Sequence, residues 1–284
     1  MKEKLLRLAA LSTIADGILL ALFGRRYARL WRLGTEEGAY YRIARWFATR
    51  PQWLLRLLGL GEVAAGVKVM GRAPLSVPSI YNTLAVPYSA IDTWWRGWLY
   101  AEAHRAFDGA IAWYLPEDGE VLDLGAGTGA NLGRLLEMGI PFASYSGVDH
   151  TEGMLEQARA KYAHLPQVHF RQLDLVREPL PKGRFDLIVS TWALEHIAQP
   201  GDVVGKAWQH LRPGGHMVLL FEVEGTGWYS ELVNRVLGFF DAQQVADVTV
   251  KQFPGLKRYE IYSGPFANLA FVLLEKQMIP AGQK

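Results

Sequence analysis

Three glycines at alternate positions follow a short apolar run that contains a single acid. The run is Val121–Leu124 with its acid Asp123, and the glycines are Gly125, Gly127 and Gly129. A buried parallel strand that ends in a glycine-rich turn before a helix brings backbone N–H groups close to a ligand. Many nucleotide-binding turns share this spacing, so these residues indicate a nucleotide-binding site without identifying the ligand.

Acids follow the next two apolar runs. Asp149 ends ASYSGVDH and Asp174 lies in VHFRQLDL. Asp149 comes about twenty residues after the glycines, where an acid at a strand tip can accept from both ribose hydroxyls. Asp174 is placed to accept from an adenine amino group. Asp123 would repel a pyrophosphate but suits an ammonium group, so the pattern favours S-adenosylmethionine over a dinucleotide.

The segment from about Val121 to Gly225 resembles a class I S-adenosylmethionine-dependent methyltransferase of the large family that acts on small molecules and lipids. The matching motifs are VLDLGAGTG, GVDHTEGML, QLDL, FDLIVSTWALEHI and LRPGG. The resemblance implies an α/β fold with a seven-stranded, mostly parallel Rossmann-like sheet and helices on both faces. It also implies a closing antiparallel hairpin near RYEIYSG and ANLAFVLLEK. A nucleotide fold with another ligand, or with an inactive pocket, is the alternative.

The same resemblance implies which residues contact S-adenosylmethionine. The residues around its methionine part would be Asp123, Gly125, Ala126, Gly127 and Gly129. The residues around its ribose and adenine would be Asp149, His150, Met154, Asp174 and Leu175. The wall between cofactor and acceptor would consist of Thr191, Trp192 and Ala193.

Methyl transfer is an in-line displacement, so positioning of the acceptor and exclusion of water are the main tasks of such an enzyme. A phenol or an acidic carbon needs a base, whereas an amine needs only to be neutral. The candidate bases, in order of preference, are His196, Tyr88, His150 and Glu222. His196 belongs to a Leu-Glu-His triplet that is common in the family, and the other interpretation of its Glu195 and His196 is structural.

The segment before the first motif is similar to a lid of quinone and phospholipid methyltransferases. Tyr81, Ala85 and Tyr88 match the lid pattern, but Ser89 replaces its usual Asp, which weakens an acceptor-binding role at that position. Three tryptophans follow at helical spacing and either pack internally or line an apolar acceptor channel. We therefore expect a helical extension at 1–73, a linker and lid at 74–98 and a methyltransferase domain at 99–284.

Several chemistries are excluded or disfavoured. The chain has no cysteine, so disulfides, thiolate metal sites and cysteine-dependent cytosine C5 or arsenic methylation are excluded. No Asp/Asn-Pro-Pro-Tyr/Phe sequence follows the fourth strand, where STWA stands, which argues against amide or exocyclic base-nitrogen methylation. The histidines are scattered and do not pair with acids at ligand spacing, so we expect no metal.

The first quarter of the chain is strongly basic. Residues 1–72 hold 13 Lys and Arg against 5 acids, a net charge of +8, which leaves −6 for the remainder of a chain at +2. Such asymmetry indicates an anionic partner, either a membrane face or a nucleic acid. Tyrosines and tryptophans interleave with the arginines, as at a lipid headgroup boundary, whereas long Leu-rich runs do not help a nucleic-acid-binding arm.

Two apolar segments at 5–23 and 53–70 have nearly the length that crosses a bilayer, but each contains a central acid, Asp16 or Glu62. We expect paired helices that lie on or dip into the cytoplasmic leaflet, so that the acids find partners. One or two marginal transmembrane helices and a soluble helical cap are the alternatives. No small-residue cleavage site follows the first segment, which favours retention, peripheral or monotopic, on the inner face of the cell membrane.

The sequence therefore favours a membrane-associated methyltransferase with a hydrophobic acceptor and an anionic membrane surface as partner through residues 1–72. A phospholipid ethanolamine headgroup is the first candidate acceptor, and a quinone or other isoprenoid lipid is the second. The alternatives are a soluble small-metabolite methyltransferase with a helical lid, a nucleic-acid methyltransferase, which we expect less, and a non-catalytic cofactor-binding subunit. The sequence specifies neither the acceptor atom nor the oligomeric state.

Overall fold

The computed structural model describes residues 2–30, 45–70, 100–225, 243–263 and 268–278 of the chain. The chain divides into two compact units, residues 1–75 and 76–284, which are described separately below. The predicted linker and lid at 74–98, including the candidate base Tyr88, lie outside the described residues.

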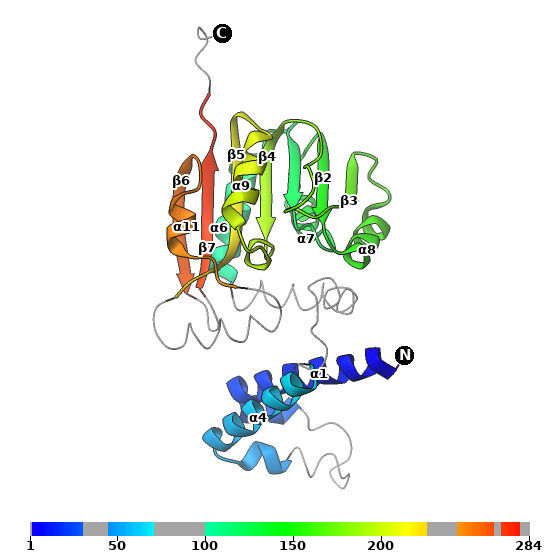
Figure 1. Ribbon diagram of the computed structural model, residues 1–284, viewed down its shortest axis with the longest axis vertical. Helices are drawn as coiled ribbons and strands as arrows, with labels where there is room; N and C mark the ends of the chain where they lie inside the picture. The colour runs from blue at the N-terminus through cyan, green and yellow to red at the C-terminus, as the bar shows by residue number, and fades with distance from the viewer. Residues whose placement is uncertain (1, 31–44, 71–99, 226–242, 264–267, 279–284) are drawn as a thin grey trace. The chain divides into compact units, whose positions relative to one another are not determined.

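The first unit is an antiparallel helix pair. Its described helices are α1 (Lys2–Phe23), α2 (Arg25–Leu30) and α4 (Gln52–Met70), and α1 packs along α4 (Figure 1). Glycines allow this close approach, because a Cβ on Gly17 would lie 2.5 Å from the carbonyl oxygen of Gly59. Both helices expected from the apolar segments are confirmed. Within the part of the chain that the structure describes, no helix combines the length and the apolar character of a membrane span.

The two central acids of this unit lie opposite each other. Glu62 hydrogen-bonds to Asp16, and Asp16 also accepts from the Tyr27 hydroxyl. Burial, the charge of Asp16 and that hydrogen bond together raise the pKa of Glu62. The expectation that these acids find partners is confirmed: Glu62 pairs with Asp16, and Asp16 pairs with both Glu62 and Tyr27.

The second unit is built on a seven-stranded sheet in the order β3-β2-β1-β4-β5-β7-β6. The strands are β1 (Glu120–Leu124), β2 (Ser144–Asp149), β3 (Val168–Gln172), β4 (Phe185–Thr191), β5 (Leu211–Val223), β6 (Leu256–Ser263) and β7 (Asn268–Glu275). Strands β1 to β5 are parallel, while β7 is antiparallel to both β5 and β6. The predicted fold class and its closing antiparallel hairpin are confirmed.

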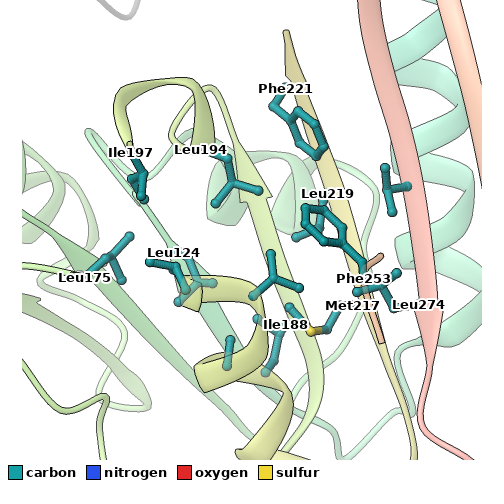
Figure 2. Packing of buried hydrophobic residues seen from close by; sticks show 14 of the residues in the cluster. Leu124, Leu175, Ile188, Leu194, Ile197, Met217, Leu219, Phe221, Phe253 and Leu274 are labelled. Carbon is teal, nitrogen blue, oxygen red and sulfur yellow. The ribbon is translucent and has the colours of Figure 1, made fainter. Parts of the chain in front are cut away.

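Helices cover both faces of the sheet (Figure 1). They are α6 (Ala101–Tyr114), α7 (Ala130–Glu137), α8 (Glu152–Tyr162), α9 (Pro200–Gln209), α11 (Asp247–Lys251) and the short 3-10 turn η2 (Leu194–His196). Alternation along β5 sends Val218 and Leu220 toward α6, and Met217, Leu219 and Phe221 toward α9. Figure 2 shows the second of these clusters, in which side chains from β1, β4 and β5 pack together.

The chain after β5 differs from expectation. The sequence favours a helix from residue 227 and a second, mostly helical stretch from Ala242, and the first of these lies outside the described residues. The second is only partly helical, since Val245 forms a parallel bridge with Val223 before the five-residue α11 begins. The short extended stretch is stabilised by backbone bonds to β5, a long-range contact that local sequence does not reveal.

The strand order places a ligand site at one edge of the sheet. The chain proceeds outward from β1 to β2 and β3, then returns to the other side of β1 with β4 and β5. In such open sheets, ligands bind at the carboxyl ends of the strands where the order reverses. The glycine turn after β1 and the residues after β4 meet at that point.

Candidate active site

The turn after β1 has the backbone that the glycines predict. Gly125, Gly127 and Gly129 have φ of 77°, 52° and 76°, which side-chain-bearing residues rarely adopt. The N–H groups of Gly125 and Ala126 donate to the Val148 carbonyl at 2.8 and 2.9 Å, so the turn is fixed to β2. Gly129 ends the turn as the residue before α7.

Gly125 also permits a contact between two strand ends. A Cβ on Gly125 would overlap the Cβ of Ala193, which follows β4. The backbone is bare at the three glycine positions, and this suits close approach of a ligand.

Asp149 holds the turn against the second strand. Its carboxylate accepts from the Gly127 N–H at 2.9 Å and from the Thr151 N–H at 2.8 Å. Burial raises the pKa of Asp149, and these two backbone bonds partly oppose the rise. A carboxylate has about four acceptor positions, so both oxygens keep capacity for ribose hydroxyls. This geometry is compatible with the predicted ribose contact.

Asp123 has a different environment from the one the sequence suggests. It is fully buried, and its carboxylate accepts from the Asn131 amide at 3.0 Å and from the Tyr145 hydroxyl at 2.5 Å. The Thr191 hydroxyl donates to the side-chain amide oxygen of Asn131 at 3.2 Å, which extends the network to β4. Asp123 therefore ties β1 to β2, α7 and β4, and its contact with the methionine part of a cofactor stays a prediction.

The residues predicted around the adenine are only partly gathered. Met154 is buried, and its methyl group lies 3.5 Å from the position of a Cβ on Gly127. His150 is exposed, and its carbonyl accepts from the Gln172 amide at 3.0 Å. Met154 thus lies beside the glycine turn, and the position of His150 is fixed through its backbone.

Asp174 and Leu175 follow the third strand. Burial of Asp174 opposes ionisation, but bonds from the Val176 and Arg177 N–H groups to its carboxylate lower its pKa overall. Leu175 is buried, and the Leu173 N–H donates to the Asp149 carbonyl at 2.8 Å. Asp174 thus stabilises the turn that follows it. The backbone just before Asp174 is fixed to Asp149, whose carboxylate accepts from Gly127 of the glycine turn.

Trp192 is in a strained conformation at the end of β4. Its φ of 56° makes it the only residue other than glycine with a positive φ among the described residues. Its N–H donates to the Leu220 carbonyl at 3.1 Å, and its ring packs against Tyr100 and His104 of the α6 region at centroid distances of 5.7 and 6.1 Å. Outliers of this kind cluster at functional sites. Residue type and spacing give no signal for it.

His196 and Glu195 lie on η2, directly after that wall. The His196 N–H donates to the Ala193 carbonyl at 3.1 Å. Glu195 is only 4% exposed, and Glu222, near the end of β5, is 8% exposed. Burial raises the pKa of Glu195 to about 8, with a further rise from the charge of Glu222, and burial raises the pKa of Glu222 to about 7.

The sequence singled out Glu195 and Glu222 separately, but it did not reveal that the two form a buried carboxyl pair. Glu222 was the last of the four candidate bases, and Glu195 was expected to orient a turn. Within the described part of the chain, no group of three or more His, Cys, Asp and Glu residues could hold a metal ion.

The sheet order, the glycine turn and the acid at the end of β2 define the class I methyltransferase architecture. Residues 121–215 match the model of a family described as "Methyltransferase domain". This segment is therefore a class I S-adenosylmethionine-dependent methyltransferase domain, and S-adenosylmethionine is its cofactor. Over 69% of this chain and 97% of the other, the fold is similar to a chain of the Haloferax volcanii complex of the Trm112 methyltransferase activator and a methyltransferase, with 18% identity and a TM-score of 0.54.

Two curated relatives show which activities occur in similar sequences. Trans-aconitate 2-methyltransferase of Deinococcus radiodurans is 36% identical over 34% of this chain and 35% of its own length. Demethylmenaquinone methyltransferase of Chlamydia trachomatis serovar L2 is 28% identical over 51% of this chain and 61% of its own length. The chain thus spans less than two thirds of either relative.

Proposed function

We propose that this protein transfers a methyl group from S-adenosylmethionine to a hydrophobic acceptor that resides in a membrane. The bare glycine turn, the acceptor capacity of Asp149 and the family match over residues 121–215 support the cofactor part. Bound S-adenosylmethionine supplies a methyl group on a positively charged sulfur. The residues of this chain then have to hold the acceptor in line and exclude water.

One surface of the first unit carries the membrane part of the proposal. Trp53, Leu57 and Leu60 of α4 are 62%, 58% and 54% exposed, and their spacing puts them on one side of the helix. We call these three residues the α4 face. Exposed arginines accompany them in the same unit, namely Arg25, Arg26, Arg45 and Arg56. Exposed bulky apolar residues beside guanidinium groups suit an anionic lipid surface.

The acceptor candidates keep the order that the sequence gives. An ethanolamine phospholipid comes first, and a quinone comes second, which the similarity to demethylmenaquinone methyltransferase supports. The similarity to trans-aconitate 2-methyltransferase favours the alternative of a soluble small metabolite. A soluble acceptor would give the exposed α4 face no role, so we prefer a lipid.

Vesicle binding tests the membrane part with a matched control. We expect full-length protein to sediment with vesicles that contain phosphatidylglycerol, and the triple variant Trp53→Ser, Leu57→Ser, Leu60→Ser to stay in solution. The control is Trp113→Ser, which removes an 82% exposed tryptophan of the second unit. Equal sedimentation of wild type and triple variant would contradict membrane docking by this face. Binding of S-adenosylhomocysteine, measured by calorimetry, checks the cofactor part separately.

A further inference from the structure

Two buried glutamates lie at the carboxyl edge of the sheet, where β4 and β5 end. We propose that Glu195 and Glu222 together bind the amino group of the acceptor and remove its proton before methyl transfer. This inference rests on the proposed methyltransferase function and narrows its acceptor to a primary amine. It assigns a role to two side chains that the cofactor site does not use.

A single extended segment holds both glutamates. The Gln243 N–H donates to the Glu195 carbonyl at 2.8 Å, and two residues later the Val245 N–H donates to the Glu222 carbonyl at 3.0 Å. The Gln243 side chain adds a bond to the Ile197 carbonyl at 3.3 Å. The same segment, residues 243–245, therefore hydrogen-bonds to the backbones of both acids. Glu195 comes four residues after Thr191, the last residue of β4, and Glu222 comes two residues after Leu220, the β5 partner of Thr191.

Among the described residues, no positively charged side chain contributes to the pKa of either glutamate. The Oε2 atoms of Glu195 and Glu222 are buried and have no hydrogen-bond partner. A buried carboxylate without a partner is costly, so it either takes up a proton or acquires a cation. The unsatisfied oxygens, together with burial below one tenth exposure, point to a ligand that brings donors of its own.

The surrounding titratable groups do not supply the missing charge. Those on neighbouring described elements are His196 on η2, His104 on α6, Tyr262 in the same row of the sheet as Glu222, and Glu224 after β5. Apart from burial and the backbone of Glu195 itself, only the charge of Glu222 acts on the pKa of Glu195. The raised pKa values of about 8 and about 7 mean that the pair holds roughly one proton near neutral pH.

A pair with one proton and one negative charge complements a single ammonium group. The ionised carboxylate accepts a proton from the ammonium, so an N–H bond breaks and the nitrogen regains its lone pair. The nitrogen then forms a bond to the methyl carbon while the carbon–sulfur bond breaks, and the sulfur keeps that electron pair. The proton taken from the amine leaves the carboxyl pair for solvent after the product departs. A quinone ring has no cation to offer these oxygens.

Activity and binding together test the inference. The variants are Glu195→Gln and Glu222→Gln in the full-length protein, with the exposed Glu224→Gln as the matched control. In mixed vesicles, we expect methyl transfer to phosphatidylethanolamine to fall by about 100-fold or more in each pair variant, as for loss of a general base. Affinity for S-adenosylhomocysteine should stay within about twofold, because neither acid belongs to the cofactor site.

A second readout does not depend on turnover. Hexylamine and hexanol have similar apolar tails, but only the amine carries a cation. We expect calorimetry on S-adenosylhomocysteine-loaded wild type to show binding of hexylamine and not of hexanol, and Glu195→Gln/Glu222→Gln to lose this preference. Equal binding of the two probes by wild type would overturn the amine site. Transfer to demethylmenaquinone but not to phosphatidylethanolamine would also overturn it, while leaving the proposed lipid methyltransferase intact. Failure to bind S-adenosylhomocysteine would instead count against the proposed function.

Discussion

The two units of this chain differ in how their exposed bulky apolar residues are grouped. In the first unit, glycines of α1 and α4 lie in contact, Leu55 of α4 is buried, and the three residues of the α4 face are exposed together. In the second unit, large apolar side chains fill both faces of the sheet, and the exposed ones are scattered over separate elements. The exposed apolar residues of α4 lie together and leave apolar area for an outside partner, whereas the packed core of the second unit positions polar groups at its edge.

The acid pairs of the two units differ in the hydrogen-bond donors that reach them. Glu62 hydrogen-bonds to Asp16, which also accepts from Tyr27, so these acids are part of an internal arrangement. The Oε2 atoms of Glu195 and Glu222 are buried without a hydrogen-bond partner, as is Oε2 of Glu62. The first pair receives a hydroxyl donor from Tyr27 of its own unit, and we infer that a ligand supplies the donors to the second pair. Four predictions break or sharpen this contrast.

The largest effect should come from the glycine turn. Gly125→Ala places a Cβ against Ala193 and needs a left-handed backbone, so we expect methyl transfer to fall by roughly a thousandfold with loss of S-adenosylhomocysteine binding. The control is Gly139→Ala, which has a similar φ of 66° but open space around its Cβ. Radiolabel transfer and calorimetry measure both variants. Equal activity in the two variants would show that the Gly125 contact is unimportant.

The pH dependence of stability should be the next largest effect. The pKa of Glu195 is about 8 in the folded chain against an ordinary value of 4.5, so between these values the folded state binds more protons than the unfolded state. Stability should therefore fall as pH rises through this window, by at most about 5 kcal/mol. Urea unfolding at a series of pH values measures this slope. Glu195→Gln should flatten it, and an unchanged slope would show that Glu195 ionises freely.

A substitution in the helix pair should destabilise the first unit alone. Gly59→Val brings side-chain atoms against the backbone of Gly17 and Ala21, and overpacking of this kind costs about 1–3 kcal/mol. The matched control is Gly61→Val, because a Cβ at Gly61 meets nothing within 4 Å. We expect Gly59→Val to weaken vesicle binding and to leave S-adenosylhomocysteine affinity unchanged. A loss of cofactor affinity would show that the two units do not behave independently.

The smallest effect, a modest loss of vesicle affinity, should come from single exposed arginines of the first unit. Replacement of Arg45 or Arg56 by Gln removes one exposed positive charge, worth about 1 kcal/mol at an anionic membrane. Vesicle affinity should therefore fall about fivefold for each variant, and the difference should shrink in high salt. Titration with vesicles of increasing phosphatidylglycerol content measures it. No difference from wild type at low salt would argue for purely apolar docking.

The sequence predicts the parts of the site that depend on local pattern. The apolar run Val121–Leu124, the three glycines and Asp149 specify a strand, a turn and an acid at a known distance, and the structure has all three. The two helices of the first unit follow in the same way from length and apolar content.

The remainder depends on contacts between distant residues. The carboxylate of Asp123 accepts from Tyr145 on β2 and Asn131 on α7, and this network follows from contacts between elements rather than from the β1 sequence. Its contact with the cofactor stays a prediction. The positive φ of Trp192 and the shared burial of Glu195 and Glu222 arise only when β4, β5 and the segment at Val245 come together. No local pattern encodes these features.

The fate of the methyl label tests the central claim most directly. Full-length protein is incubated with radiolabelled S-adenosylmethionine and anionic vesicles made from a total lipid extract, alongside the triple variant of the α4 face. Label is then followed into organic-extractable, water-soluble and nucleic-acid fractions. We predict label in the organic fraction as methylated phosphatidylethanolamine, strongly reduced in the triple variant. Label confined to water-soluble material, and equal for both proteins, would contradict a methyltransferase that reaches its acceptor at the membrane.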